Sequence, residues 1–183
     1  SAYEMSLQEL QAALEKTPSL KKYERVNKLV EAMQRKELTS VGHKFADFEI
    51  TYNGKTERLS DYVGNGKYVI VDFWASWCRD CILALPKAKE LEDKNPNINF
   101  IFFSLERNKE AFHKSIKRFT MEEKENYWFS TGWKNDFNNY IDLNWIPRYM
   151  IIDQQSNIAK YYAISPEDPE IQTTIDKLIK TQL

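Results

Sequence analysis

The sequence predicts an α/β fold in which helices flank a central β-sheet, and three observations support this prediction. Residues 68–74 and 98–105 are nearly continuous apolar runs, as expected for strands of a sheet that is covered on both faces. Between these runs, residues 82–91 have the periodicity of an amphipathic helix. The chain has 183 residues with a hydrophobic content of 42%, enough to bury the core of one ordinary domain and to form some additional structure.

The first 40 residues are predicted to be a helical extension, separate from a main domain of residues 41–183. One short helix is expected to end at Pro18. A second is expected from about residue 19 to 37, with an apolar stripe formed by Leu20, Tyr23, Val30 and Met33. Positive and negative charges nearly cancel here, which indicates a solvated surface. We weigh two interpretations, a structural appendage packed on the domain and an arm that binds a partner or a second copy.

The segment that leads to the central strand is predicted to be extended. Residues 41–48 read as an extended entry. Residues 48–52 and 55–59 alternate polar and apolar side chains around Asn53-Gly54, which is a strong signal for a two-residue β-hairpin. The central strand follows at residues 68–74.

The rest of the chain is predicted to alternate helices and strands. Helices are expected from the end of the central strand to about residue 93, and at residues 108–119, 134–140 and 166–183. Strands are expected at residues 98–105, 127–129, 148–152 and 158–164, the last as an edge strand.

Two cysteines, Cys78 and Cys81, stand where the central strand is followed by a helix. The first backbone N–H groups of a helix are unpaired and carry partial positive charge, which stabilises a thiolate. Cysteines at such positions or in Cys-x-x-Cys motifs can have pKa values lowered from about 8.5 to roughly 3.5–7.5. Cys78, at the helix tip, is therefore predicted to be the attacking nucleophile, and Cys81, one turn deeper, the resolving thiol.

Other interpretations of the cysteine pair agree less well with the sequence. A closed structural zinc site needs four ligands. The chain offers only the two cysteines and two histidines, His43 and His113, which lie far apart in the sequence, and His43 reads as a surface residue. A structural disulfide across so short a loop would gain little from restricting the unfolded chain. We therefore expect redox chemistry and no bound metal.

The residues around the cysteines resemble the active-site signature of the thioredoxin family. The matching positions are Val71-Asp72-Phe73-Trp74-Ala75, Trp77, Cys78, Cys81, the helix proline Pro86, and Ile146-Pro147 at the place of the family's cis-proline. The resemblance covers roughly residues 41–183 and implies a thioredoxin-like fold. Its details are similar to the TlpA-like branch of bacterial envelope proteins, whose inserted helix-strand unit would here occupy about residues 106–140.

The resemblance also implies roles for Asp72 and Pro147. Because Asp72 interrupts an apolar strand, we expect its carboxyl to be buried behind the cysteines, with a pKa raised by desolvation. By resemblance, this carboxyl would hold or relay the proton of Cys81 when the mixed disulfide resolves. Pro147 is expected to be cis and to face the cysteine pair, which would leave the Ile146 backbone free to pair with an extended substrate peptide.

Substrate contacts are expected from the residues next to the cysteines. Trp77 is predicted to cover the disulfide and to offer an apolar docking surface. Arg79 and Asp80 separate the cysteines. The positive charge of Arg79 favours a nearby thiolate and the negative charge of Asp80 opposes it, so their signs conflict and no redox potential is predicted.

Three positions depart from the patterns of the family. Trp145 stands where many thioredoxins have Gly, and Arg148 stands where many have Thr, so we expect both to change the groove beside the disulfide. Some TlpA-like reductases have an acidic residue three positions after the second cysteine. Here that position is Ala84, and Glu106 is a candidate to replace the missing acid.

The function implied is that of a thiol-disulfide oxidoreductase that exchanges protein disulfides, as a reductant in the bacterial envelope or periplasm. The resemblance implies no cofactor and an upstream dithiol reductant, which we expect to be membrane-bound. A net charge of −1 indicates no general attraction to nucleic acid or anionic membranes. No apolar run reaches the length of a membrane span. Because Ser1-Ala2 is not a natural start, we expect an export or anchor segment to have preceded it.

Two alternative functions stay open at this point. The entry near Phe45 is similar to that of peroxiredoxins, which would permit a thiol peroxidase. Those enzymes usually place a Thr shortly before a single peroxidatic Cys, whereas here Ser76 and Trp77 precede Cys78 and a second cysteine follows it. The other alternative is a non-enzymatic binding module with a structural disulfide. The substrate is equally open among apocytochrome c thiols, secreted proteins and a dedicated oxidoreductase partner.

Overall fold

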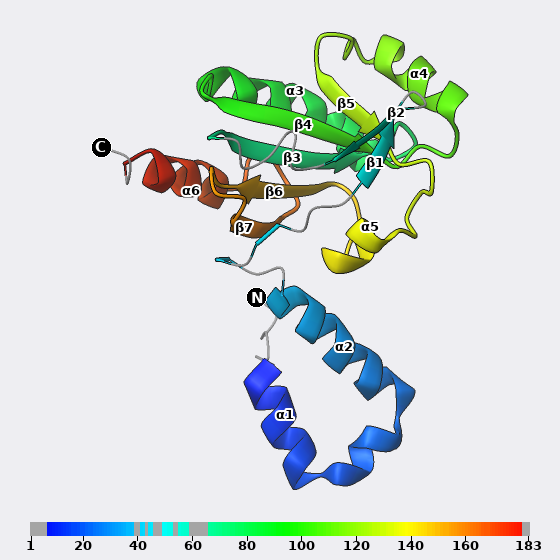
Figure 1. The fold of residues 1–183 in the computed structure, drawn as a ribbon, viewed down its shortest axis with the longest axis vertical. Coiled ribbons are helices and arrows are strands. Elements are labelled where there is room, and N and C mark those ends of the chain that lie inside the picture. Colours follow the sequence, from blue (N-terminus) through cyan, green and yellow to red (C-terminus); the bar gives the residue numbers. More distant parts are fainter. Residues whose placement is uncertain are drawn as a thin grey trace.

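A five-stranded mixed sheet forms the centre of the molecule (Figure 1). The structure is a computed structural model that describes residues 7–38, 41–42, 44–45, 49–52, 55–58 and 66–180. In spatial order the strands are β5 (Glu125–Trp128), β4 (Ile98–Ser104), β3 (Tyr68–Trp74), β6 (Arg148–Ile152) and β7 (Ile158–Ala163). Because β3 is parallel to β4 and antiparallel to β6, the central strand is hydrogen-bonded on both sides.

The main domain has four helices among the described residues, and they lie on both faces of the sheet. They are α3 (Arg79–Lys94), α4 (Lys109–Arg118), α5 (Asp136–Tyr140) and α6 (Pro169–Lys180). Phe137 of α5 packs on the ring of Phe73, with centroids 6.1 Å apart. The neighbouring Trp74 faces the other side, because successive strand residues alternate, and its ring lies 6.3 Å from that of Phe119 at the end of α4.

The core confirms that the central strands are covered on both faces. Every residue of β3 and β6 is buried. The residues that α3 and α6 bury recur at helical spacing, and they are Cys81, Leu85, Ala88, Leu91, Ile171 and Ile175. The C-cap of α3, Asn95, also donates from its side-chain amide to Gln172 of α6 at 2.9 Å, so the end of α3 contacts the first turn of α6.

Side-chain caps set where three helices begin. Asn108 accepts a hydrogen bond from the N–H of Ala111, so α4 starts one residue later than predicted. In the same way the side chain of Asn135 caps α5, and Asp168 accepts from the N–H of Glu170 near the start of α6. The helices predicted at 134–140 and 166–183 are therefore shorter at their starts, and residues 181–183 lie outside the described residues.

The unit formed by α4 and β5 extends one edge of the sheet. Strand β5 pairs in parallel with β4, and it begins two residues earlier than the predicted 127–129 and ends at Trp128. The ring of Trp128 packs on Phe112 of α4, with centroids 6.4 Å apart. The predicted helix-strand unit within residues 106–140 is thus present, and its strand lies beside β4, one strand away from β3, which leads to the cysteines.

The predicted hairpin and entry lie before the central strand. Strands β1 (Glu49–Tyr52) and β2 (Lys55–Arg58) pair antiparallel, with Tyr52 opposite Lys55, whereas the turn residues Asn53 and Gly54 lie outside the described residues. In the entry, Lys44 forms an isolated bridge with Asn157, and Phe45 is buried in the core. The entry therefore runs along the start of β7.

The N-terminal helices form an arm that lies to one side of the sheet (Figure 1). It consists of α1 (Leu7–Lys16), a 3-10 helix η1 (Pro18–Lys22) and α2 (Glu24–Leu38), which pack on one another. The single helix predicted from about residue 19 is wrong. Tyr23 has an extended backbone with φ −87° and ψ 125°, so the chain breaks between η1 and α2. Leu20 and Tyr23 are exposed and do not belong to the stripe of α2.

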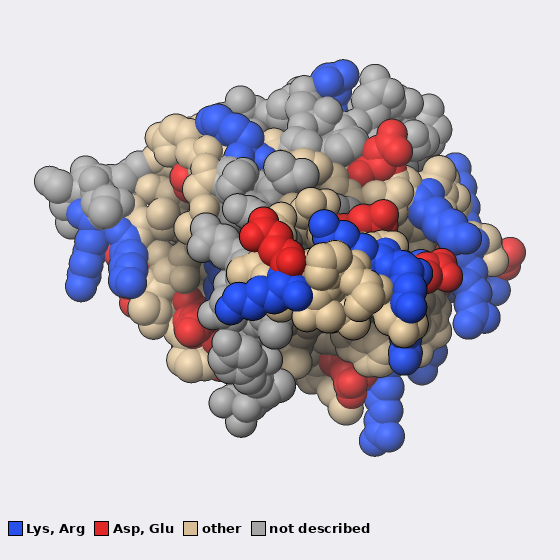
Figure 2. Space-filling model, turned by 90° about the horizontal axis from the view of Figure 1, so that it is seen from below, with Lys and Arg blue, Asp and Glu red and all other residues tan. Residues whose placement is uncertain are grey.

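The surface seen from the side of the N-terminal arm carries both positive and negative side chains. Seen from below the view of Figure 1, blue and red side chains are interspersed (Figure 2). On α2, Lys28 and Glu24 form an exposed ion pair one turn apart. None of the helices in the described part of the chain is both long enough and apolar enough to cross a membrane.

Candidate functional site

The cysteine pair lies at the N-terminus of α3, directly after the turn that follows β3. Cys78 is the N-cap of this helix, with an extended backbone at φ −92° and ψ 103°. Its sulfur accepts a hydrogen bond from the N–H of Cys81 at 3.2 Å, where a cap usually offers a side-chain oxygen. The sulfur of Cys78 therefore occupies the position where unpaired N–H groups and the helix dipole favour negative charge.

Cys78 and Cys81 are joined in a disulfide, with their Cα atoms 5.3 Å apart. Cys78 is 9% exposed and Cys81 is 2% exposed. The first sulfur is thus the more accessible of the two, and the second lies deeper in the core, in the order expected for an attacking and a resolving thiol.

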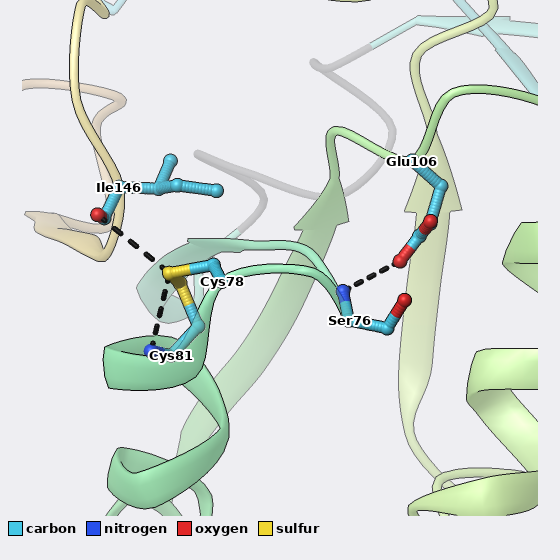
Figure 3. The surroundings of a disulfide bond; sticks show 5 residues. All are labelled: Ser76, Cys78, Cys81, Glu106 and Ile146. Atoms are coloured by element: carbon cyan, nitrogen blue, oxygen red, sulfur yellow. Dashed lines mark hydrogen bonds between the residues drawn. A yellow bond between two sulfur atoms is a disulfide. The ribbon is translucent and has the colours of Figure 1, made fainter.

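A loop that contains a cis peptide bond lies against the disulfide. The bond joins Ile146 and Pro147, immediately before β6. The carbonyl oxygen of Ile146 lies 3.7 Å from the sulfur of Cys78 (Figure 3). Residues nearly seventy positions apart in sequence are thus brought together because β6 pairs with β3, the strand that leads into the cysteines.

The carboxyl group of Asp72 is buried in the middle of the sheet. Asp72 is 1% exposed, and Tyr149 of β6 lies directly opposite it in the strand register. Burial raises the pKa of Asp72 well above its ordinary value, and a hydrogen bond from Tyr149 partly opposes that increase. One carboxyl oxygen has no hydrogen-bond partner among the described residues. Asp72 is therefore a carboxyl group whose charged form is poorly stabilised.

Tyr149 was not singled out from the sequence. Burial raises the pKa of its hydroxyl, and the negative charge of Asp72 raises it further. The hydroxyl therefore stays protonated and donates a hydrogen bond to Asp72. Its position two residues after Pro147 indicates a contact with Asp72 only once the pairing of β6 with β3 is known.

A second buried carboxyl group, that of Glu106, contacts the turn before Cys78. Glu106 is 3% exposed, and its Oε1 accepts a hydrogen bond from the backbone N–H of Ser76 at 2.5 Å (Figure 3). We expected Glu106 only as a replacement for the acid missing at Ala84. The structure places it beside the turn, where it binds backbone.

Exposed aromatic side chains adjoin Cys78 and Ile146 in the sequence. Trp77 is 44% exposed, and its ring lies 6.3 Å from that of Trp133. Trp145, which immediately precedes Ile146, is 64% exposed. Arg79 and Asp80 are exposed on the first turn of α3. These side chains offer apolar area and both signs of charge on the surface around a mostly buried sulfur.

Arg148 does not line the surface beside the disulfide, which corrects the expectation from the sequence. Its side chain is buried, and its guanidinium donates to the carbonyl oxygens of Ile141 and Tyr161. The guanidinium also lies 4.4 Å from the centre of the Tyr161 ring. Because Arg148 pairs in register with Phe73, it faces the opposite side of the sheet from Tyr149. It braces β7 and the end of α5.

Only one of the two histidines lies within the described residues. His113 is exposed on α4, and His43 lies outside the described residues. Across the described ranges, no group of three or more His, Cys, Asp or Glu side chains is arranged to hold a metal ion.

Comparisons of the sequence identify a family and relatives among thiol-disulfide oxidoreductases and thioredoxins. A family model described as thioredoxin-like matches residues 65–158. A stretch of 57 residues, 31% of this chain, is 40% identical to the thiol-disulfide oxidoreductase ResA of Geobacillus kaustophilus and covers 32% of it. A stretch of 65 residues, 34% of this chain, is 32% identical to thioredoxin-2 of Pyricularia oryzae and covers 38% of it. The matches thus span about a third of the length of these curated relatives.

Solved structures share the fold over most of the chain. A Bacteroides vulgatus protein assigned to the thiol-disulfide oxidoreductases is 30% identical, with a TM-score of 0.62 over 79% of this chain and 93% of its own. The thiol:disulfide interchange protein DsbE assigned in Chlorobium tepidum is 19% identical, with a TM-score of 0.63 over 76% of this chain and 98% of its own, and that likeness concerns the fold alone.

Proposed function

Since the chain belongs to the thioredoxin-like family, we propose that it is a thiol-disulfide oxidoreductase that acts on proteins. The observation that carries this proposal is the position of the cysteine pair. The sulfur of Cys78 caps α3 and lies beside the carbonyl oxygen of Ile146, and Cys81 is bonded to it from one turn deeper. This arrangement supports the proposal, because the two sulfurs and the backbone of the Ile146-Pro147 loop lie side by side.

The reaction moves two electrons from the reduced cysteine pair to a substrate disulfide. The Cys78 thiolate attacks one substrate sulfur and forms a mixed disulfide, and the substrate's other sulfur leaves as a thiolate that takes a proton. The thiolate of Cys81 then attacks the sulfur of Cys78, which closes the Cys78–Cys81 disulfide and releases the second substrate sulfur. The substrate leaves as a dithiol.

We assign the proton of the second step to Asp72. The thiol of Cys81 must lose its proton before it attacks, and a carboxyl whose pKa is raised by burial is a better proton acceptor than an ordinary carboxylate. Burial keeps water away from this group, and Tyr149 holds the carboxyl from the neighbouring strand. Asp72 is therefore the general acid and base of the resolving step.

We assign substrate binding to the backbone of Ile146 beside Pro147 and to the exposed side chains nearby. An extended peptide can pair with free backbone next to the disulfide, as in strand addition. Trp77 and Trp145 present exposed apolar area to such a peptide, and Arg79 and Asp80 offer one charge of each sign. Arg148 has no part in this surface, because it is buried.

The site of action and the direction of electron flow belong to the same proposal. Similarity to ResA and to the TlpA-like branch supports a reductant in the bacterial envelope that is recharged by an upstream dithiol protein. The division into a helical extension of residues 1–40 and a catalytic domain of residues 41–183 stays a prediction, as does the role of the arm.

The test uses the Cys81→Ser variant in the envelope of the source bacterium. Without the resolving thiol, mixed disulfides on Cys78 should accumulate, and reductant should release the bound proteins for identification. The Cys78→Ser variant is the matched control and should trap nothing. If neither variant traps a protein and the reduced wild-type chain consumes peroxide instead, the assignment moves to a thiol peroxidase.

A further inference from the structure

The carboxylate of Glu106 is buried without an ion pair. Glu106 follows the end of β4, where the chain leaves the sheet. The salt bridges among the described residues involve other acids, so no cation within 4.0 Å compensates this charge there. Burying a carboxylate is costly unless hydrogen bonds stabilise it. Its contact with the turn before Cys78 therefore needs an explanation beyond chance packing.

The hydrogen bond from Ser76 to Glu106 fixes the turn that delivers Cys78. Within this turn the N–H of Cys78 donates to the carbonyl oxygen of Ala75 at 3.1 Å. The N–H of Ser76 donates to an acceptor outside the turn. The Oε1 of Glu106 is that acceptor, at 2.5 Å. Hydrogen bonds to a charged acceptor are shorter and about twice as strong as neutral ones. The carboxylate thus constrains the backbone two residues before the reacting sulfur.

Two further hydrogen bonds of Glu106, and one of the residue before it, hold its backbone in place. Its N–H donates to the hydroxyl of Ser104 at 3.2 Å, and its carbonyl oxygen accepts from the indole N–H of Trp128 at 2.8 Å. The preceding residue, Leu105, donates from its N–H to the carbonyl oxygen of Trp74. Glu106 is therefore anchored to the ends of β3 and β4 and to β5, so its charge has a fixed position.

A fixed negative charge at the turn two residues before Cys78 acts differently on the two redox states. The disulfide is neutral and is unaffected, whereas a thiolate at Cys78 is repelled and the pKa of its thiol rises. Destabilising the reduced form makes a pair a stronger reductant, just as stabilising it makes an oxidant. Arg79 and Asp80 also carry charge near the pair, and Asp72 is a titratable group in the strand before it, but a change at Glu106 leaves all three in place.

We propose that Glu106 is a positioning residue that orients the turn before Cys78 through the Ser76 backbone and biases the pair toward the disulfide, so that the protein acts as a reductant. This inference rests on the proposed function. It assigns the direction of electron flow to a residue of the β4–α4 connection, 28 positions after Cys78. The helix dipole lowers the pKa of the Cys78 thiol, and the charge of Glu106 makes that decrease smaller.

The test compares Glu106→Gln with wild type and with Glu110→Gln, an exposed acid of α4 that is ion-paired to Lys114. The glutamine keeps the size and the hydrogen-bond acceptor for Ser76 but removes the charge. We expect the pKa of the Cys78 thiol, followed by thiolate absorbance in the reduced protein, to fall by about half a unit to one unit. We expect the equilibrium with glutathione to shift about three- to tenfold toward the reduced pair, which is about 15–30 mV.

Glu110→Gln should leave both quantities at their wild-type values. The proposal is overturned if Glu106→Gln leaves both unchanged or moves them in the opposite direction while wild type exchanges normally with glutathione. If wild type does not exchange at all, both the proposed function and the role of Glu106 are wrong. The Glu106→Ala variant removes the acceptor as well. If its redox potential matches that of Glu106→Gln but its thiol-disulfide exchange is slower, the result supports the orienting role.

Discussion

Asp72 and Glu106 are both buried carboxyl groups near one disulfide, but the protein surrounds them differently. Asp72 lies within β3, faces a single tyrosine and has one oxygen without a partner among the described residues. Glu106 follows the end of β4 and accepts a hydrogen bond from the backbone N–H of Ser76. The sheet thus leaves one carboxyl poorly solvated and gives the other a charge-assisted hydrogen bond.

The difference separates two tasks that a redox pair needs. A carboxyl whose pKa is raised by burial can take up and release a proton during the reaction. A carboxylate held by backbone acts instead through a constant charge and a fixed geometry. We therefore expect changes at Asp72 to alter rates and pH dependence, and changes at Glu106 to alter the equilibrium between the dithiol and the disulfide.

The largest effect is expected from Asp72→Asn, which keeps the shape of the side chain but cannot carry the proton. Release of substrate from the mixed disulfide should slow by about 100-fold at neutral pH, the low end of general acid–base effects. Rapid-mixing fluorescence with a disulfide peptide separates this step from the attack by Cys78. Equal slowing of both steps, or of the attack alone, would remove Asp72 from its proposed role.

The second effect concerns stability and pH. Because the pKa of Asp72 is raised in the folded protein, the folded state keeps a proton that the unfolded chain releases above about pH 3.9. The stabilisation from Asp72 is complete below that value and is lost as pH rises toward the folded pKa, at up to about 1.4 kcal/mol per pH unit. The Asp72→Asn variant has no such loss. In urea unfolding of the oxidised proteins, its free energy of unfolding relative to that of wild type should therefore increase with pH. Parallel stability curves would contradict the raised pKa.

A smaller effect is expected from Tyr149→Phe. The hydrogen bond from Tyr149 lowers the pKa of Asp72, so its removal should raise that pKa further. The pH profile of the resolving step should move to higher pH, and its rate at neutral pH should change by about two- to tenfold, as for the loss of one hydrogen bond. Tyr162→Phe, on the exposed side of β7, is the control. A rate change without a shift of the pH profile would indicate a packing role only.

The fold and the family were predicted from the sequence, and both are confirmed. The apolar runs at β3, β4 and β6 are informative because a sheet covered on both faces requires them. The cysteines could be placed at a helix start because helical periodicity follows them directly. In each case the signal is local, so neighbouring residues suffice to read it.

What escaped prediction depends on contacts between distant parts of the chain. The partner of Asp72 follows from the register of β6 on β3, and the bond between Ser76 and Glu106 joins residues 30 positions apart. Arg148 was expected beside the disulfide, but strand alternation turns it to the opposite face, toward the carbonyl oxygens of Ile141 and Tyr161. The break at Tyr23 is local, yet an apolar stripe that continued across it hid the break.

The account depends most on Cys78 being the accessible, acidified sulfur, and selective alkylation tests this directly. Reduced protein is treated briefly with iodoacetamide at about pH 6.5, blocked with a second reagent under denaturing conditions and digested with trypsin. Cleavage after Arg79 separates the two cysteines into different peptides for mass spectrometry. We expect the first label on Cys78, in at least about tenfold excess over Cys81. Equal labelling, or preferential labelling of Cys81, would contradict it.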